Sequence, residues 1–184
     1  AQSDRIENLF VGPGNGGTQT WNVELNPMDF DQVAAFCLEQ QVDLVVVGPE
    51  APLVAGIWDF FASNKATHHI SVIGPSQAGA QLEGSKDFAK GFMQRQGIPT
   101  AAYATFTAAA LEEGLSYLEQ QSFPIVLKAD GLAAGKGVVI CPDLESAKAE
   151  LRDMLADGKF GEASARVVME EFLAGREFSV FVLT

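Results

Sequence analysis

The most informative stretch of this chain is Lys128-Ala129-Asp130-Gly131-Leu132-Ala133-Ala134-Gly135-Lys136-Gly137-Val138. Apolar runs stand on both sides of it, at residues 125–127 and 138–140, so two strands are predicted to flank a glycine-rich turn. Three glycines leave the backbone free to turn its amide groups toward one point, and the lysines bring positive charge to the same place. Such a turn is typical of phosphate binding.

This turn is not a Walker A loop. The spacing from Gly131 to Gly135 and Lys136 is one residue short, Gly137 stands where a Ser or Thr would bind magnesium, and a strand follows where a helix is needed. The alternative is a flexible hairpin with exposed lysines. Lys128 favours a functional interpretation, because a lysine at the end of an apolar strand is rarely placed without a partner.

The first half of the chain alternates strand and helix signals. Largely apolar runs at residues 9–11, 43–47 and 71–73 each end in a Gly/Pro turn. An amphipathic helix is predicted between the first two, and a second helix begins near Pro52. The apolar stripes of these helices are Phe30, Val33, Ala34, Cys37 and Leu38, and then Leu53, Val54, Ile57, Trp58 and Phe61. This β-α-β-α-β order predicts an α/β fold with a parallel sheet covered on both faces.

The second half has a different pattern, with a boundary between Leu82 and Tyr103. Its predicted helices begin near Lys86, at a Thr107 cap and at an Asp143 cap. The first of them buries Phe88, Ala89, Phe92 and Met93 and ends at Gly97 and Pro99, the second carries Leu111, Leu115 and Leu118, and the third ends near Gly158. Further strands are predicted at 167–169 and 178–183. The chain is thus two α/β units of different style.

Composition excludes some function classes. The chain has 24 acidic and 12 basic residues and a formal net charge of −12, so no nucleic-acid partner is expected. No apolar run reaches membrane-spanning length and the first residues are not a signal peptide, so the protein is expected to be cytoplasmic, with no membrane partner. Cys37 and Cys141 are interpreted as buried thiols, with a disulfide disfavoured, and His68 and His69 as surface histidines.

Four segments in the same order resemble phosphoribosylamine–glycine ligases, a family of the ATP-grasp superfamily. Residues 123–138 look like the nucleotide-covering hairpin of that family, and residues 82–86 resemble the motif before its ATP-binding subdomain. Residues 47–53 resemble a substrate-side loop, and residues 169–179 match the ATP-grasp linker. One match alone is weak, whereas four in family order span most of the chain.

The resemblance implies two domains. Residues 1–83 are expected to form the N-terminal, pre-ATP-grasp domain with a parallel sheet, incomplete at its start. Residues 84–184 are expected to form the first part of an ATP-grasp domain. Within it lie the nucleotide-covering subdomain, at about 103–168, and the adenine-binding linker, at 169–178.

The resemblance also implies an ATP site. Lys86 and Lys128 are expected to contact the phosphates and to act in catalysis, since a compact ammonium suits a phosphate as a point charge. Glu170 is expected to bind the adenine edge and Glu177 the ribose hydroxyls. The remaining expected ATP contacts are Gly131, Ala134, Gly135, Lys136 and Gly137 over the phosphates and Glu171, Phe172 and Leu173 beside the base. The structural alternatives are a solvated lysine at a helix start for Lys86 and a solvated strand edge for Glu170 and Glu171.

A second site is expected on the first domain. Gly48, Pro49 and Glu50 follow a buried strand, and ligands of open α/β sheets bind at the carboxyl ends of strands. Together with Pro13, Gly14 and Asn15, they are assigned to binding of 5-phosphoribosylamine. A tight turn followed by a helix cap explains the same residues nearly as well.

The implied reaction joins glycine to 5-phosphoribosylamine in purine biosynthesis, at the expense of ATP and through a glycyl phosphate. Magnesium or manganese is the implied metal, with its Glu and Asn ligands and much of the glycine site expected beyond residue 184. No metal ligand is therefore expected within this chain, which is expected to be an inactive fragment of a monomeric enzyme.

Three other functions remain open. An ATP-grasp carboxylase of the biotin or aminoimidazole type shares the hairpin and the linker, and a non-catalytic nucleotide-binding module would lack the metal ligands. A Rossmann oxidoreductase needs GxGxxG after its first strand. Residues 12–17 lack its final spacing and contain a proline.

Overall fold

The computed structural model describes residues 3–133, 135–180 and 182 of the chain. The chain forms two compact units, Ala1–Glu83 and Gly84–Thr184, and each has its own hydrophobic core.

The first unit is built on a short parallel sheet. Strand β1 (Leu44–Val46) pairs in parallel with β2 (Ser71–Ile73), and Leu44 lies opposite Ser71. The helices are α1 (Phe30–Glu39), α2 (Glu50–Ala55), α3 (Ile57–Ser63) and α4 (Gln77–Gly84), with a short 3-10 helix at Gln19–Trp21. The buried residues are Val33, Ala34, Cys37, Leu53, Ile57, Phe61, Ile70 and Ala80. The parallel pairing predicted from the sequence is confirmed for these two strands. The predicted cover on both faces is wrong, because Leu44 and Val46 of β1 and Ile73 of β2 are exposed on the face opposite the buried residues.

Two further predictions for the first unit are wrong in detail. The run at residues 9–11 is not a strand, because Val11 forms only an isolated bridge to Asn22 while Phe10 packs edge-on against Phe36. The helix predicted from Pro52 is split at Gly56, whose left-handed φ of 98° ends α2 before α3 begins. Ile57 and Phe61 are the buried residues of α3, whereas Trp58 is exposed.

The second unit contains a four-stranded antiparallel sheet. Its strands are β3 (Tyr103–Thr107), β4 (Ile125–Ala129), β5 (Val138–Cys141) and β6 (Arg166–Glu171), in the order β3-β6-β4-β5. Strands β4 and β5 pair as a hairpin around the glycine-rich turn, as predicted.

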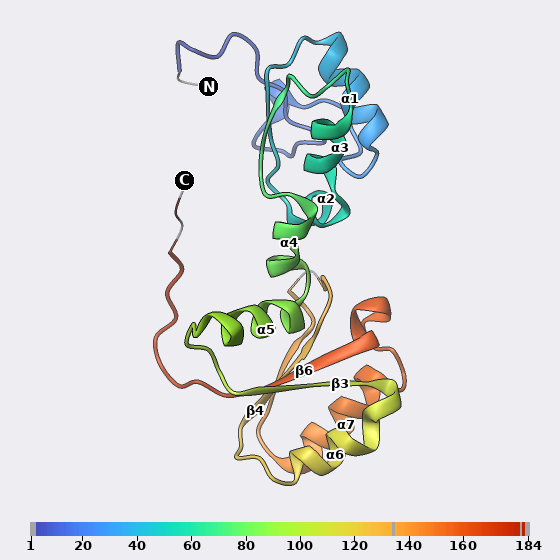
Figure 1. The fold of residues 1–184 in the computed structure, drawn as a ribbon, viewed down its shortest axis with the longest axis vertical. Coiled ribbons are helices and arrows are strands. Elements are labelled where there is room, and N and C mark those ends of the chain that lie inside the picture. Colours follow the sequence, from blue (N-terminus) through green and yellow to red (C-terminus); the bar gives the residue numbers. More distant parts are fainter. Residues whose placement is uncertain (1–2, 134, 181, 183–184) are drawn as a thin grey trace. The chain divides into compact units, whose positions relative to one another are not determined.

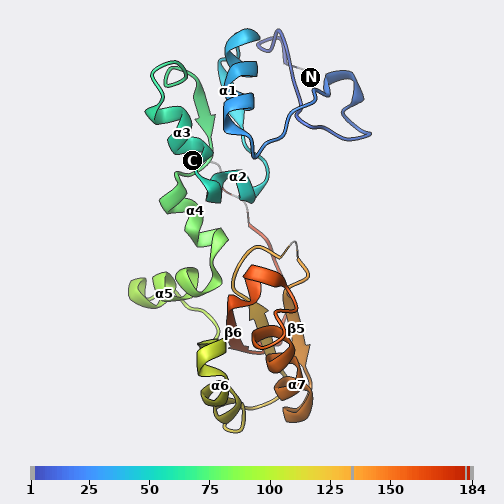
Figure 2. The same cartoon turned by 90° about the vertical axis from the view of Figure 1, so that its right-hand side faces the viewer.

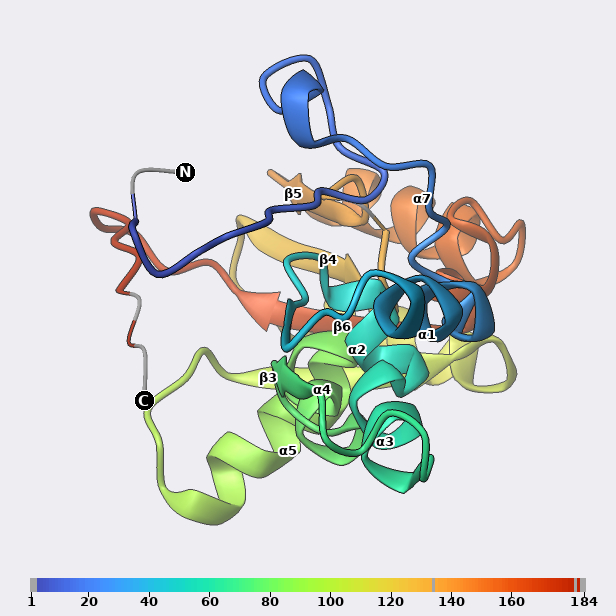
Figure 3. The same ribbon diagram turned by 90° about the horizontal axis from the view of Figure 1, so that it is seen from above.

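The strand predicted at 178–183 is wrong for residues 178–180, and positions 181, 183 and 184 lie outside the described residues. Phe178 and Val180 are 82% and 83% exposed. They have apolar side chains suited to a strand, but no neighbouring strand of the described chain pairs with them. Figure 3 shows the chain running on from the end of β6 without forming another strand.

Helices lie on both faces of this sheet. Helices α6 (Leu111–Leu118) and α7 (Leu144–Leu155) pack side by side against one face, and α5 (Lys86–Gln96) lies on the other (Figures 1 and 2). The core between the sheet and α6 and α7 consists of Leu115, Leu118, Ile125, Leu127, Ala129, Cys141, Ala147, Leu151, Met154, Leu155, Val167 and Met169.

The helix ends of the second unit match the predictions with one exception. The Asp143 carboxylate accepts a hydrogen bond from the Ser146 amide at 2.8 Å, which caps α7 and lowers the pKa of Asp143. Gly97 ends α5 with a φ of 65°. Thr107 makes no capping hydrogen bond, because a 3-10 turn at Ala108–Ala110 comes between it and α6.

The interior of α5 also differs from its prediction. Phe88 is exposed, whereas the buried residue of this helix is Lys90. The helix therefore turns a charged residue toward the sheet, and its neighbours form the site described below.

Cys37 and Cys141 are free and buried, one in each unit, so the disfavoured disulfide is absent. Burial raises the pKa of both thiols. Every helix in the described ranges is too short or too polar to cross a lipid bilayer.

Candidate functional site

The face of the sheet opposite α6 and α7 carries two rows of paired residues. Directly paired residues of antiparallel strands share a face. One row runs Ile140, Val126, Glu170 and Tyr103, and the other runs Val138, Lys128, Val168 and Thr105. Lys128 and Glu170 thus come together on this face, away from the core.

Glu170 is paired with two lysines. Its Oε1 lies 3.0 Å from Lys128 Nζ and its Oε2 lies 2.9 Å from Lys90 Nζ. The side chains of Glu170 and Lys90 are each 7% exposed, and that of Lys128 is 27% exposed. The partner predicted for Lys128 from its place on an apolar strand is therefore Glu170.

Asp130 ties the root of the hairpin to the start of α5. Its carboxylate accepts hydrogen bonds from Ser85 Oγ at 3.1 Å and from the Asp87 amide at 2.8 Å. Ser85 in turn caps α5 by accepting from the Phe88 amide at 3.1 Å. Lys86 Nζ donates to the carbonyl oxygens of Asp130 and Gly131, at 3.3 and 3.2 Å. Lys86 is therefore held at the base of the glycine-rich turn.

Asp87 and Arg166 continue this network. Arg166 lies 2.8 Å from the Asp87 carboxylate and 3.8 Å from that of Asp130, and Thr105 Oγ1 donates to Asp87 at 2.7 Å. The start of α5, the hairpin root and the edge of the sheet are thereby joined through side chains.

Sequence reasoning missed Lys90, Asp87, Asp130 and Arg166 as members of this site. One usable signal was present, since Lys90 follows Lys86 by four residues and so lies on the same side of α5. Arg166 carried no comparable signal.

The glycine-rich turn is tightly built at Gly137. A β-carbon there would lie 2.7 Å from Ala133 Cβ and 3.1 Å from Ala129 Cβ. The Gly137 carbonyl accepts from the Ala129 amide at 2.7 Å, and Gly135 has a left-handed φ of 76°. Lys136 is exposed at the tip, and Ala134, an expected ATP contact, lies outside the described residues.

The linker residues lie beyond this cluster. The Glu171 carboxylate accepts a hydrogen bond from the Ala102 amide at 2.8 Å, so this side chain joins the end of β6 to the residue before β3. Phe172 and Leu173 are exposed. Glu177 is also exposed and makes no hydrogen bond or ion pair with any part of the chain that the structure describes.

The expected substrate residues of the first unit lie in two exposed loops. Gly48 and Pro49 follow β1, and Glu50 begins α2. Gly14 has a φ of 80° and packs against Asn22 in the other loop, between Pro13 and Asn15. Across the described ranges, no hydrogen bond joins the two loops.

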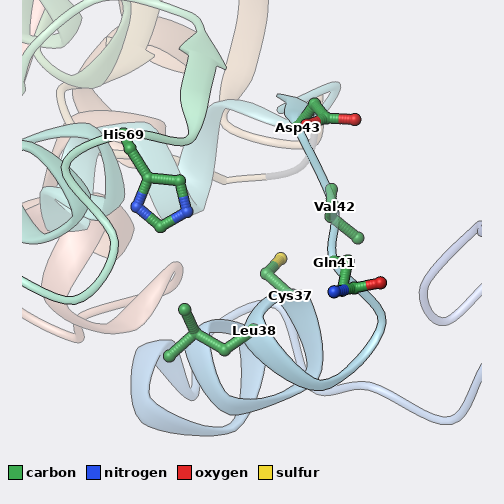
Figure 4. Close-up of a pocket in the computed structure, with 6 residues that line it drawn as sticks. All are labelled: Cys37, Leu38, Gln41, Val42, Asp43 and His69. Atoms are coloured by element: carbon green, nitrogen blue, oxygen red, sulfur yellow. The ribbon is translucent and has the colours of Figure 1, made fainter.

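A separate pocket of about 240 Å³ occurs in the first unit (Figure 4). It is lined by Cys37, Leu38, Gln41, Val42, Asp43 and His69, none of which was an expected site residue. The ring of His69 faces the residues of α1 across this pocket. His68 and His69 are both exposed, in agreement with the surface placement predicted for them.

Both units match family models. Residues 84–184 match the phosphoribosylglycinamide synthetase ATP-grasp (A) domain, and residues 1–83 match the N domain of the same synthetase. The second unit therefore belongs to the ATP-grasp class of proteins. The chain as a whole belongs to the phosphoribosylglycinamide synthetase family.

Individual relatives agree with this placement. The chain is 51% identical over its whole length to the phosphoribosylamine–glycine ligase of Allochromatium vinosum, and it spans 42% of that protein. The crystal structure of the phosphoribosylamine–glycine ligase from Thermotoga maritima matches with a TM-score of 0.64 and 30% identity, over 89% of this chain and 37% of that one.

A more distant match extends to the fold alone. The biotin carboxylase domain of Hydrogenobacter thermophilus 2-oxoglutarate carboxylase matches at a TM-score of 0.61 with 23% identity, over 83% of this chain and 34% of that one.

Proposed function

We propose that this chain forms part of an ATP-dependent ligase that joins glycine to 5-phosphoribosylamine in purine biosynthesis. The chain spans 42% of the length of the curated relatives it matches, so the proposed activity is that of a longer protein. The observation that carries the proposal is the pairing of Lys128 with Glu170 on the sheet face beside the glycine-rich hairpin.

The proposed nucleotide lies against this face of the second unit. Lys86 and Lys128 contact its phosphates, and the turn with Gly131, Ala134, Gly135, Lys136 and Gly137 covers them. Glu170 binds the adenine edge, and Ile140, which is 56% exposed on the same face, offers apolar surface to the base. The remaining proposed contacts are Glu171, Phe172 and Leu173 at the base and Glu177 at the ribose.

The proposed chemistry has two steps. A carboxylate oxygen of glycine attacks the γ-phosphorus of ATP, which yields glycyl phosphate and ADP. The amine of 5-phosphoribosylamine then attacks the acyl carbon, and the amide forms as inorganic phosphate leaves. The ammonium groups of Lys86 and Lys128 stabilise negative charge on the transferred phosphoryl group, which is a matter of positioning and electrostatics.

The second substrate is assigned to the first unit. Pro13, Gly14, Asn15, Gly48, Pro49 and Glu50 form the proposed 5-phosphoribosylamine loops. Support comes from the place of Gly48 and Pro49, which begin one residue beyond the end of β1, at the edge where parallel sheets bind ligands.

The proposed metal is magnesium or manganese, and the described side chains of this site do not form a binding site for it. Within the described ranges, no group of three or more His, Cys, Asp or Glu residues is placed to hold a metal ion.

We also propose that the protein works in the cytoplasm as a monomer. Support for a reducing compartment comes from Cys37 and Cys141, which are both free.

The proposal is tested by ADP release from the complete protein with ATP and magnesium, with glycine and 5-phosphoribosylamine added separately and together. Release only when both substrates are present is the expected result. ADP release driven by bicarbonate or another acid would show that the substrate assignment is wrong. No ADP release with any pair of substrates would favour a nucleotide-binding module.

A further inference from the structure

Lys90 is a buried lysine with a full set of partners. Its residue is 5% exposed, which is rare for a lysine. The ammonium group donates to Thr100 Oγ1 at 2.8 Å and to the Ala101 carbonyl at 3.2 Å, and it lies 2.9 Å from Glu170 Oε2. The Tyr103 ring lies 5.6 Å away, measured from Nζ to the ring centre. All three donors of the ammonium group therefore have acceptors, and Lys90 is fixed in place.

The two carboxylate oxygens of Glu170 pair with two lysines that differ in exposure. Lys90 occupies Oε2 from the interior, and Lys128 meets Oε1 from the more exposed side. A buried carboxylate left without a compensating charge is strongly unfavourable. Because Lys90 pairs with Glu170 from the interior, Lys128 can turn toward another anion without leaving Glu170 unpaired.

We propose that Lys90 is a positioning residue for nucleotide binding, which holds Glu170 in place and leaves the charge of Lys128 available to the nucleotide phosphates. This inference rests on the proposed nucleotide site. In a protein without Lys90, Glu170 would keep Lys128 as its remaining ion-pair partner among the described residues, and phosphate binding would compete with that pair.

A purely structural role for Lys90 makes different predictions. Lys90 also connects α5 to the loop at Thr100 and Ala101, so its loss lowers stability in either case. A structural role alone would not raise the KM for ATP selectively, and it would not depend on the charge of Glu170.

The first experiment replaces Lys90 by methionine, which keeps the chain length and removes the charge. In the complete protein, the Kd for ATP measured without other substrates should rise on the order of tenfold to a hundredfold, because a misplaced contact group costs about that much. The KM for ATP should rise in parallel, the KM for glycine should stay the same, and Lys90→Arg should recover part of the loss. An unchanged Kd for ATP in folded Lys90→Met would overturn the inference.

A matched control removes a lysine ion pair elsewhere in the second unit. Lys148 lies 2.6 Å from Glu119, which is 57% exposed, on the side of the sheet that carries α7. Lys148→Met should leave the Kd for ATP unchanged. An equal rise in both variants would assign the effect to general destabilisation and overturn the inference.

A double-mutant cycle tests whether Lys90 acts through Glu170. Coupled residues show non-additive effects. In a Glu170→Gln background, Lys90→Met should therefore change the Kd for ATP far less than it does in the parent protein. The same fold-change in both backgrounds would contradict the inference.

Thr100→Val keeps the test possible if Lys90→Met does not fold. This variant removes one acceptor of Lys90 and keeps its charge, and the Kd for ATP should rise about twofold to tenfold, as for one lost hydrogen bond. An unchanged Kd for ATP in Thr100→Val would then overturn the inference.

The binding assays use ATP alone, so they are independent of the proposed acid and amine substrates. A protein that binds ATP through Lys90 but does not ligate glycine would remove the proposed reaction and leave this inference standing.

Discussion

At the scale of single residues, Asp130 links two parts of the second unit that are far apart in sequence. Its carboxylate accepts from Ser85 Oγ and the Asp87 amide, while its carbonyl accepts from Lys86 Nζ. One residue thus fixes the first turn of α5, the hairpin root and a proposed phosphate lysine relative to one another.

Replacing Asp130 by alanine should therefore affect both stability and ATP binding. Loss of the carboxylate leaves the Asp87 amide and the Ser85 hydroxyl without this acceptor, and the free energy of unfolding should fall by about 1–3 kcal/mol. The Kd for ATP should rise, because Lys86 and the turn lose their anchor. Denaturant unfolding and equilibrium binding measure the two effects.

Asp143→Ala is the matched control for this substitution. Asp143 also caps a helix in the second unit, through the Ser146 amide, but it lies at the start of α7, which packs on the opposite face of the sheet from the site. Its loss should lower stability and leave ATP binding unchanged. Equal ATP affinity in Asp130→Ala and the parent protein would show that the hairpin root does not position the site.

At the scale of elements, the β4–β5 hairpin combines a rigid base with a glycine-rich tip. The base is fixed by ladder pairing from Ile125 with Cys141 to Lys128 with Val138. Above the base, Gly137 packs closely on Ala129 and Ala133, so the return path of the turn has no room for a side chain.

Gly137→Ala should distort the turn and weaken ATP binding. The added methyl group would lie 2.7 Å from Ala133 Cβ, so the turn has to shift before the chain can re-enter β5. The methyl group would also lie 3.1 Å from Cβ of Ala129, at the end of the core under α6 and α7, so the midpoint of thermal unfolding should fall modestly while the Kd for ATP rises. Calorimetry and ATP titration of the same samples separate the two.

Gly16→Ala provides the comparison, because a β-carbon at Gly16 meets nothing within 4 Å and Gly16 belongs to no proposed site. Its Kd for ATP should equal that of the parent protein. If Gly137→Ala binds ATP as tightly as Gly16→Ala does, the turn does not cover the phosphates.

At the scale of the whole molecule, the two units differ in how completely their cores are buried. In the second unit Leu118, Leu127, Leu151, Met154, Val167 and Met169 are fully buried. In the first unit Val33 and Leu53 are 8% and 9% exposed. Buried apolar area drives folding, so the second unit is expected to be the more stable.

The two cysteines make this expectation measurable. Cys37 lies in the first core and Cys141 in the second, and burial raises the pKa of both thiols, so both stay protonated and protected in the folded state. Labelling with iodoacetamide at increasing denaturant should modify Cys37 before Cys141. Cys37→Ala and Cys141→Ala leave one reporter each, and labelling in the reverse order would contradict the expectation.

The direction of the pH effect follows from the raised pKa values. The folded state favours the protonated thiols, so their contribution to stability is fully present below the unfolded pKa of about 8.5. That contribution is lost as the pH rises through the higher pKa of the folded state. Labelling at a pH just below the unfolded thiol pKa therefore reports the unfolding that exposes each cysteine.

The sequence by itself determined the local features of this protein. The hairpin around the glycine-rich turn, the Asp143 cap of α7 and the Gly97 end of α5 all follow from patterns within a few residues. The parallel pairing of two first-unit strands follows from the order of strand and helix signals along the chain. The family resemblance was readable for the same reason, because its motifs are contiguous stretches of chain.

The tertiary structure alone decided which distant residues meet. Lys90 and Glu170 are eighty residues apart by their numbers, and they touch because α5 lies over β6 in the order β3-β6-β4-β5. The same dependence on neighbours explains the errors, since residues 9–11 and 178–180 have mainly strand-like apolar side chains but no full partner strand. A strand needs a second strand, and a buried charge needs its counter-charge, and neither requirement is written in a local pattern.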